Sequence, residues 1–291
     1  MESSLILSFW PFVGSRNKAL NQLKEKMESP TLSEIKDLLY EMGFEEKAAA
    51  KILYYTQREA EKTIKILMKQ SIHVVDFWSI HYPRSLRFIE NPPWNLFFMG
   101  NLPQPIATLA VVGSRKADEY GKELVEKFLP GLKTRPLQIV SGLAQGIDSL
   151  AHVWSCEIQV PNFAIMGCGL DQIYPIQNTK LAERILSQGG GWLSEYPPGV
   201  EPLAHHFPYR NRIISGLSDV VWVVQATTKS GSLHTAQHGL NQGKVVAVVP
   251  GNIYQELSEL PNELLFSGAQ PILKATDLDL LLEKERFKLP H

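Results

Sequence analysis

The sequence predicts an α/β fold with a doubly wound, mostly parallel sheet and a small helical domain in front of it. Short apolar runs typical of buried strands alternate with helix-like stretches over most of the chain. Three of these runs are followed by loops of small residues, at 113–115, 141–146 and 229–232. Loops that follow the strands of a doubly wound sheet share one edge, so we expect these three loops to meet there.

Length and composition are those of an ordinary globular protein. The 291 residues can hold a large and a small domain, and an apolar content of 44% is ample for a packed core. No run approaches the roughly 18 apolar residues of a membrane helix, and acidic Glu2 lies where a leader peptide carries basic residues. The two cysteines, Cys156 and Cys168, are too few for a disulfide framework or a four-ligand zinc site. We therefore expect a cytoplasmic protein with no membrane association.

The chain divides into three segments. Residues 1–70 are rich in Lys, Glu, Leu and Ala and predict a helical domain. Its Met42-Gly43-Phe44 step is similar to the turn of SAM or helix-hairpin-helix modules, which bind DNA backbones or proteins, although a packing module without a ligand fits equally well. Residues 71–104 predict an apolar, extended connector that enters the sheet. Residues 105–291 predict the sheet domain, with a helix at its C-terminal end.

Within the sheet domain, strands and helices alternate in a regular order. The apolar runs predict about six strands, at 109–112, 137–140, 162–166, 191–193, 220–224 and 245–249. The predicted helices cover 118–129, 147–157, 179–188, 233–242 and 277–285. This alternation is the basis for expecting a mostly parallel sheet.

The first loop, Gly113-Ser114-Arg115, lies where a dinucleotide-binding protein has its Gly-x-Gly-x-x-Gly fingerprint. The second and third glycines of that fingerprint are missing, so the loop gives poor support for dinucleotide binding. Arg115 instead suggests a guanidinium that clamps a phosphate from the end of a strand. A structural ion pair of Arg115 is the competing explanation.

The other two loops also lack the residue order of a P-loop, which argues against an ATPase. Ser141, Gly142 and Gly146 can offer backbone N–H groups next to a helix N-terminus, where anions bind. In the third loop, Lys229 adds a positive charge before Ser230, Gly231 and Ser232. Capping of the following helix explains Ser232 well but leaves Lys229 unexplained. Together the three loops predict a site for a phosphorylated ligand.

An aromatic and basic segment, residues 207–216, lies between the second and third loops. Arg210, Asn211 and Arg212 could contact phosphates while Phe207 or Tyr209 stacks on a base, which suits a single nucleic-acid strand. Ion pairs that tie the arginines to the sheet are an equally good explanation. Since the formal net charge is −1, any nucleic-acid binding has to come from a local basic patch such as this one.

Neither a metal site nor a catalytic group is expected. Two pairs lie four residues apart on predicted helices, Asp148 with His152 and His234 with His238, but neither pair has a convincing third ligand in the sequence. Glu195 is the strand-end carboxylate that could serve as a general base, and it has no nucleophile beside it. We therefore expect a structural role for Glu195, and no cofactor.

The motifs, taken in order, resemble the DNA-processing protein A (DprA/Smf) family of bacteria. The resemblance covers about two thirds of the chain, and a complete ordered series is far more specific than any one motif. It rests on Tyr82-Pro83-Arg84-Ser85-Leu86, Gly113-Ser114-Arg115, Ser141 to Asp148, Ala151-His152, Gly169-Leu170-Asp171, Tyr174-Pro175, Ser194-Glu195, Phe207-Pro208, Arg210 to Ser218, Lys229 to Leu233 and Val249-Pro250-Gly251.

The resemblance implies an extended Rossmann-like domain that binds single-stranded DNA without sequence preference. It further implies protection of incoming DNA and loading of the RecA recombinase in natural transformation, by a homodimer that performs no catalysis. Arg115 and Lys229 match family positions that lie in the DNA pocket. The chain departs from the family where Gln225 replaces a usual glutamate, and it ends too soon after Ala269 for the winged-helix domain of many members.

An enzyme acting on a phosphorylated nucleoside is the alternative. The nucleotide phosphoribohydrolases of the lysine-decarboxylase-like superfamily share a comparable phosphate-binding sheet. They use a Pro-Gly-Gly-x-Gly-Thr loop followed closely by a glutamate. The corresponding segment here, residues 229–237, contains no carboxylate.

Overall fold

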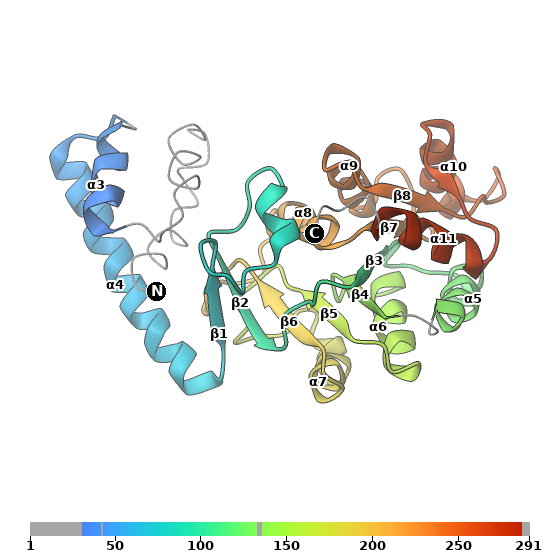
Figure 1. The fold of residues 1–291 in the computed structure, drawn as a ribbon, viewed down its shortest axis with the longest axis horizontal. Coiled ribbons are helices and arrows are strands. Elements are labelled where there is room, and N and C mark those ends of the chain that lie inside the picture. The colour runs from blue at the N-terminus through green and yellow to red at the C-terminus, as the bar shows by residue number, and fades with distance from the viewer. Residues whose placement is uncertain (1–30, 42, 133–135, 287–291) are drawn as a thin grey trace.

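One nine-stranded sheet organises the part of the chain that this computed structural model describes, residues 31–41, 43–132 and 136–286 (Figure 1). The strand order is β1-β2-β6-β5-β4-β3-β7-β8-β9. The strands are β1 (His73–Asp76), β2 (Asn95–Gly100), β3 (Ala107–Val112), β4 (Leu137–Ser141), β5 (Asn162–Ile165), β6 (Gly191–Ser194), β7 (Val220–Val223), β8 (Val245–Val248) and β9 (Gln270–Pro271).

The winding of the sheet confirms the predicted fold class. β3 pairs in parallel with β4 on one side and with β7 on the other. From β3 the chain moves outward through β4, β5 and β6, and then returns to the other side of β3 to add β7, β8 and β9. Ligands of such sheets bind where the winding reverses, outside the carboxyl ends of the strands. Here that point lies at the ends of β3, β4 and β7.

The segment predicted as a connector contributes two strands to the sheet. β1 pairs with β2, and β2 pairs with β6, both antiparallel. The expectation of about six strands was therefore wrong, since the described residues form nine. The apolar character of the segment has a packing cause, because Leu96 and Phe97 of β2 are fully buried. An antiparallel addition of this kind leaves no helix-length crossover in the sequence from which it could be recognised.

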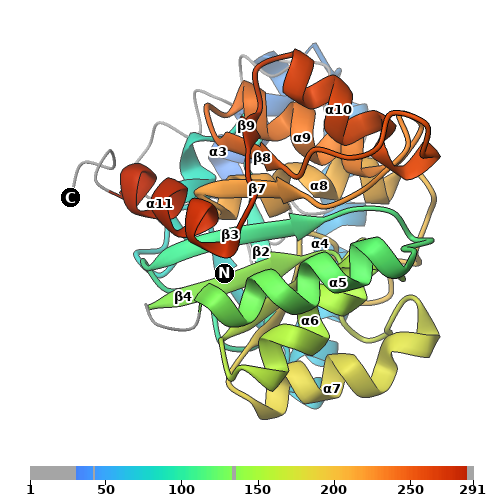
Figure 2. The ribbon, with the colours of Figure 1, turned by 90° about the vertical axis from the view of Figure 1, so that its right-hand side faces the viewer.

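Helices cover both faces of the sheet (Figure 2). One face carries α5 (Glu119–Phe128), α6 (Ile147–Glu157), α7 (Thr179–Ser187) and α11 (Ala275–Arg286), and the other carries α8 (His206–Leu217), α9 (Ser232–Asn241) and α10 (Glu259–Phe266). Alternate residues of β3 face the two layers: Leu109 and Val111 pack with Phe128 of α5, whereas Ala110 and Val112 pack with Ile213 of α8. Burial on both faces explains why the strands are continuous apolar runs.

Among the described residues, two helices precede the sheet, α3 (Leu32–Glu41) and α4 (Glu46–Gln70). They lie at one end of the molecule, beyond the edge strand β1 (Figure 1). Residues 1–30, which include Glu2 and the first part of the predicted helical domain, lie outside the described residues, as does Met42 of the Met42-Gly43-Phe44 step. Within the described ranges, no helix has the length and apolar character required to cross a membrane.

Candidate nucleic-acid interface

The segments that follow β3, β4 and β7 meet at the carboxyl edge of the central strands. The backbone N–H of Ser114, after β3, donates to the carbonyl of Gln225, after β7, at 2.7 Å. The N–H of Ile147, which begins α6 after β4, donates to the carbonyl of Ser114 at 3.1 Å. Ser114 therefore joins the segments that follow β3, β4 and β7. The contact after β7 is made by Gln225, which precedes the predicted loop 229–232.

Two glycines permit this close approach. Gly146 has a φ of +75°, and a Cβ added to it would lie 2.2 Å from the carbonyl oxygen of Ser114. A Cβ on Gly113 would lie 2.6 Å from Cγ1 of Ile147. Side chains at these positions would push the loops apart, so the glycines hold the loop after β4 directly against the loop after β3.

Gly142 is enclosed by two buried charged side chains. Its N–H donates to Oδ2 of Asp148 at 3.1 Å, and its carbonyl accepts from Nη1 of Arg210 at 3.1 Å. Arg210 also donates to the carbonyl of Ile165 at the end of β5. Burial raises the pKa of Asp148, and the positive charge of Arg210 opposes that shift. The N–H of Gly142, predicted to bind an anion, is thus engaged with a carboxylate of the protein.

The loop serines hold the loops in shape through their hydroxyl groups. The Ser141 hydroxyl is fully buried and donates to the carbonyl of Val111 at 2.7 Å. The Ser114 hydroxyl accepts from the N–H of Lys116 at 3.0 Å. In the third loop, the Ser230 hydroxyl accepts from the N–H of Ser232 at 3.3 Å. Capping was predicted for Ser232, but Ser232 is itself the first residue of α9 and Gly231 is its N-cap.

Arg115 and Lys229 face solvent at this edge, as does Lys116 beside Arg115. Arg115 and Lys229 are both exposed, and neither makes a salt bridge with another described residue. The guanidinium carbon of Arg115 lies 5.9 Å from the centre of the Phe207 ring, at the N-terminal end of α8. For Arg115, the competing explanation of a structural ion pair therefore has no support among the described residues.

A pocket of about 330 Å³ opens beside Arg115. Its wall contains the backbone of Gly142 and the rings of Tyr174 and Phe207, whose centres are 5.3 Å apart. Gln145 and the segment from Ile173 to Gln177 complete the lining with Ala144. The pocket thus combines a free cation with aromatic surface, a combination that suits a phosphorylated ligand carrying a flat base. The position of Tyr174 in the pocket wall was not predicted from its chemistry. The signal in the sequence that could have revealed it is an aromatic residue before a proline, in a loop that follows a strand.

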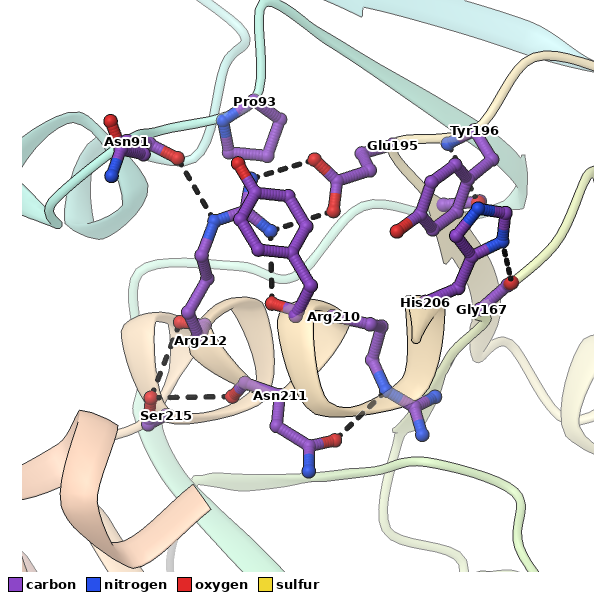
Figure 3. Close-up of polar contacts among 12 residues, drawn as sticks. Asn91, Pro93, Gly167, Glu195, Tyr196, His206, Arg210, Asn211, Arg212 and Ser215 are labelled. Carbon is purple, nitrogen blue, oxygen red and sulfur yellow. Dashed lines mark hydrogen bonds and ion pairs between the residues drawn. The ribbon is translucent and has the colours of Figure 1, made fainter. Parts of the chain in front are cut away.

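Arg210, Asn211 and Arg212 lie within α8 and are all buried (Figure 3). Arg212 forms a two-pronged ion pair with Glu195, with both N–O distances at 2.6 Å, and its Nε donates to the carbonyl of Asn91 at 3.0 Å. Asn211 donates to the carbonyl of Gly231 at 3.1 Å and so fixes the third loop to α8. Phosphate contacts by the two arginines, one of the two explanations considered, are not available in this arrangement, because both side chains are buried and are engaged with protein oxygens. Glu195 has the structural role expected of it.

His152, one of the weighed metal-ligand candidates, lies in the core. Its Nδ1 is 2.8 Å from Oδ1 of Asn162, and burial lowers its pKa to about 4. Asp148, its partner in the pair, is occupied by the backbone of Gly142. Across the ranges that the structure describes, no three His, Cys, Asp or Glu side chains are placed to hold a metal ion.

Comparisons with known proteins agree with this architecture. The model of the family described as DNA recombination-mediator protein A matches residues 73–283. Protein Smf of Escherichia coli is 38% identical over 87% of this chain and 67% of its own length. DNA processing protein DprA of Streptococcus pneumoniae is 41% identical over 68% of this chain and 70% of its own.

Two solved structures are similar over most of the chain. The X-ray structure of S. pneumoniae DprA gives a TM-score of 0.80 at 31% identity and covers 94% of this chain and 95% of its own. The structure of DNA processing protein A from Helicobacter pylori, described for its single-stranded DNA binding mode, gives a TM-score of 0.65 at 30% identity. It covers 73% of this chain and 96% of its own. The chain therefore belongs to the DNA recombination-mediator protein A family, the DprA/Smf family.

Proposed function

We propose that this protein binds single-stranded DNA along the carboxyl edge of its central strands. The observation that carries the proposal is the pair of exposed cations, Arg115 and Lys229, which have no salt-bridge partner among the described residues and lie on adjoining loops. Phosphates are their natural ligands, and phosphate contacts dominate the affinity of such complexes. The single-stranded DNA binding described for the H. pylori relative supports the same ligand class.

The pocket beside Arg115 receives a base in this proposal. Tyr174 and Phe207 offer ring surface to it, and stacking on aromatic rings is indifferent to base identity. The remaining predicted residues shape the site: Gly113, Gly142 and Gly146 allow the loops to pack, and the serines at 114, 141, 230 and 232, with Gly231, form their turns. Arg210, Asn211 and Arg212 support the site from within α8.

We further infer that the bound strand is passed to the RecA recombinase and protected on the way, as in natural transformation. The description of the family as a recombination mediator and the DprA names of the relatives support this step. In this proposal the protein acts as a homodimer and by binding alone. The carboxylate of Asp148 is buried and accepts from the N–H of Gly142, which lines the pocket.

Fluorescence anisotropy of a labelled oligothymidine tests DNA binding. Wild type should bind the single strand more tightly than a duplex of equal length, with affinity falling as salt rises. Arg115→Ala/Lys229→Ala should weaken binding to every sequence and reduce the slope of log affinity against log salt by about 1.4, at ~0.7 for each lost phosphate contact.

A charge-matched control separates a local site from general attraction. Lys127→Ala/Lys284→Ala also removes two positive charges, from exposed positions in the last turns of α5 and α11. Helices that follow parallel strands run back along the sheet, so these turns lie at the opposite edge. This control should bind as wild type does. Failure of wild type to bind the strand, or equal losses in both double variants, would refute the proposed site.

A further inference from the structure

Tyr209 is held against a guanidinium that cannot move. The guanidinium carbon of Arg212 lies 3.9 Å from the centre of the Tyr209 ring. Arg212 is itself fixed by both carboxylate oxygens of Glu195 and by the carbonyl of Asn91, and its side chain is only 4% exposed. One face of the Tyr209 ring is thus covered by a rigid, flat group, which sets the orientation of the ring before any ligand arrives.

The same tyrosine remains open to solvent. Tyr209 is 47% exposed, although it belongs to a helix in which Arg210, Asn211 and Arg212 are buried. Because Arg212 covers one face of the ring, the exposed surface belongs to the rest of it. A fixed aromatic ring with free surface is the kind of group on which single-stranded nucleic acids stack their bases.

Its position extends the proposed site. Residues two apart in a helix point to opposite sides, so Tyr209 faces away from Phe207, which lines the pocket. Figure 3 shows this division for their neighbours, with Arg210 and Asn211 on one side of α8 and Arg212 on the other. Along the helix axis the two rings are separated by only ~3 Å. A single DNA strand that leaves the pocket and crosses the first turn of α8 therefore comes close to Tyr209.

The charges around Tyr209 favour a base over a phosphate. Glu195 neutralises Arg212, so the guanidinium under the ring brings no net positive charge. The pKa of Tyr209 is raised, first by burial and also by the negative charges of Glu195 and Glu90, against the opposing effect of Arg212. The hydroxyl therefore stays neutral at physiological pH, and the negative charge of Glu90 disfavours a phosphate beside it.

We propose that Tyr209 is a stacking platform for one nucleobase of the strand whose phosphates contact Arg115 and Lys229. The inference rests on the proposed function and adds a second contact class on the other side of α8. The contribution of Arg115 and Lys229 to the DNA affinity depends on salt concentration, whereas the stacking contribution of Tyr209 does not. The two contributions can therefore be measured separately.

The test compares wild type, Tyr209→Leu and Tyr209→Phe on two labelled strands of equal length, an oligothymidine and the same backbone with abasic residues. Tyr209→Leu should bind oligothymidine about tenfold more weakly, with an unchanged slope of log affinity against log salt. Tyr209→Phe keeps the ring and should bind as wild type does. On the abasic strand all three proteins should bind alike, and thermal unfolding checks that each variant is folded.

The outcomes distinguish this inference from the function on which it rests. If wild type binds oligothymidine and Tyr209→Leu binds it equally well, the platform is refuted while the DNA site stands. An equal loss by Tyr209→Leu on both strands would show a structural role for the tyrosine and also refute the platform. If wild type binds neither strand, the DNA site and the platform fail together.

Discussion

Two pairs of cations lie at the same edge of this sheet and have opposite surroundings. Arg115 and Lys229, on the loops after β3 and β7, are exposed and have no salt-bridge partner among the residues described. Arg210 and Arg212, in α8, are 4% and 3% exposed and are engaged with backbone oxygens and with Glu195. The difference separates two tasks: the buried pair holds the loops and the edge strands in place, and the exposed pair is free to meet a ligand.

The comparison predicts which property each cation controls. A buried charge that loses its partner is strongly destabilising, because the remaining charge stays out of water. An exposed lysine or arginine contributes little to stability, and its removal is felt only when an anion binds. Four changes test this division on one scale, the free energy of unfolding, from the largest expected effect to the smallest.

Arg212→Ala should lower the free energy of unfolding by about 3–5 kcal/mol, because it leaves the partly buried Glu195 without its cation. Urea unfolding measures the loss. The double variant Arg212→Met/Glu195→Met removes both charges and should recover most of the stability. A single variant as stable as wild type would contradict the structural assignment of Arg212.

The buried charge of Arg210 also bears on His152. Burial, with Arg210 as a smaller contribution, lowers the pKa of His152 from 6.5 to about 4. The unfolded chain therefore binds this proton first, and the stability due to neutral His152 is present above pH 6.5 and is lost as the pH falls to about 4. We expect a loss of roughly 3 kcal/mol over that interval. Unfolding curves of wild type and His152→Gln should diverge in this pH window, and parallel curves would exclude the effect.

Gly146→Ala should cost about 1–3 kcal/mol, because an alanine there needs a φ of +75° and places its Cβ 2.2 Å from the Ser114 carbonyl oxygen. It should also weaken DNA binding by displacing Arg115. Gly231→Ala is the matched control, since Gly231 has a φ of −58° and open space around its Cβ position. Equal stability of the two variants, measured by thermal unfolding, would show that the loops do not need their close contact.

Arg115→Ala/Lys229→Ala should change the free energy of unfolding by no more than about 0.5 kcal/mol while it removes most of the DNA affinity. This variant sharpens the comparison most directly, because it should leave the stability nearly unchanged, whereas Arg212→Ala should lower it strongly. A large loss of stability would place Arg115 or Lys229 among the structural cations.

Local patterns in the sequence were enough to predict the six strands from β3 to β8, but not β1, β2 or β9. The run at Leu137 forms β4 and the run at Val220 forms β7, because continuous apolar residues buried on both faces leave a clear signal. The state of the arginines was not predictable, since their partners are remote: Glu195 lies 17 residues before Arg212, and Gly142 lies 68 residues before Arg210. Whether such a cation is paired depends on packing that no local pattern contains.

The position of β3 has a consequence for how the chain is made. Thr108 of β3 donates its N–H to the carboxylate of Asp219, just before β7, which is 111 residues further along the chain. On a ribosome that adds ~5–20 residues per second, the β7 side of β3 waits on the order of ten seconds for its partner. During that time a strand whose residues are all buried in the folded protein shows an unpaired edge, a template for pairing with other nascent chains. Synthesis that pauses before residue 220 therefore prolongs the exposure of this edge, and slow codons in that interval should lower the yield of folded protein.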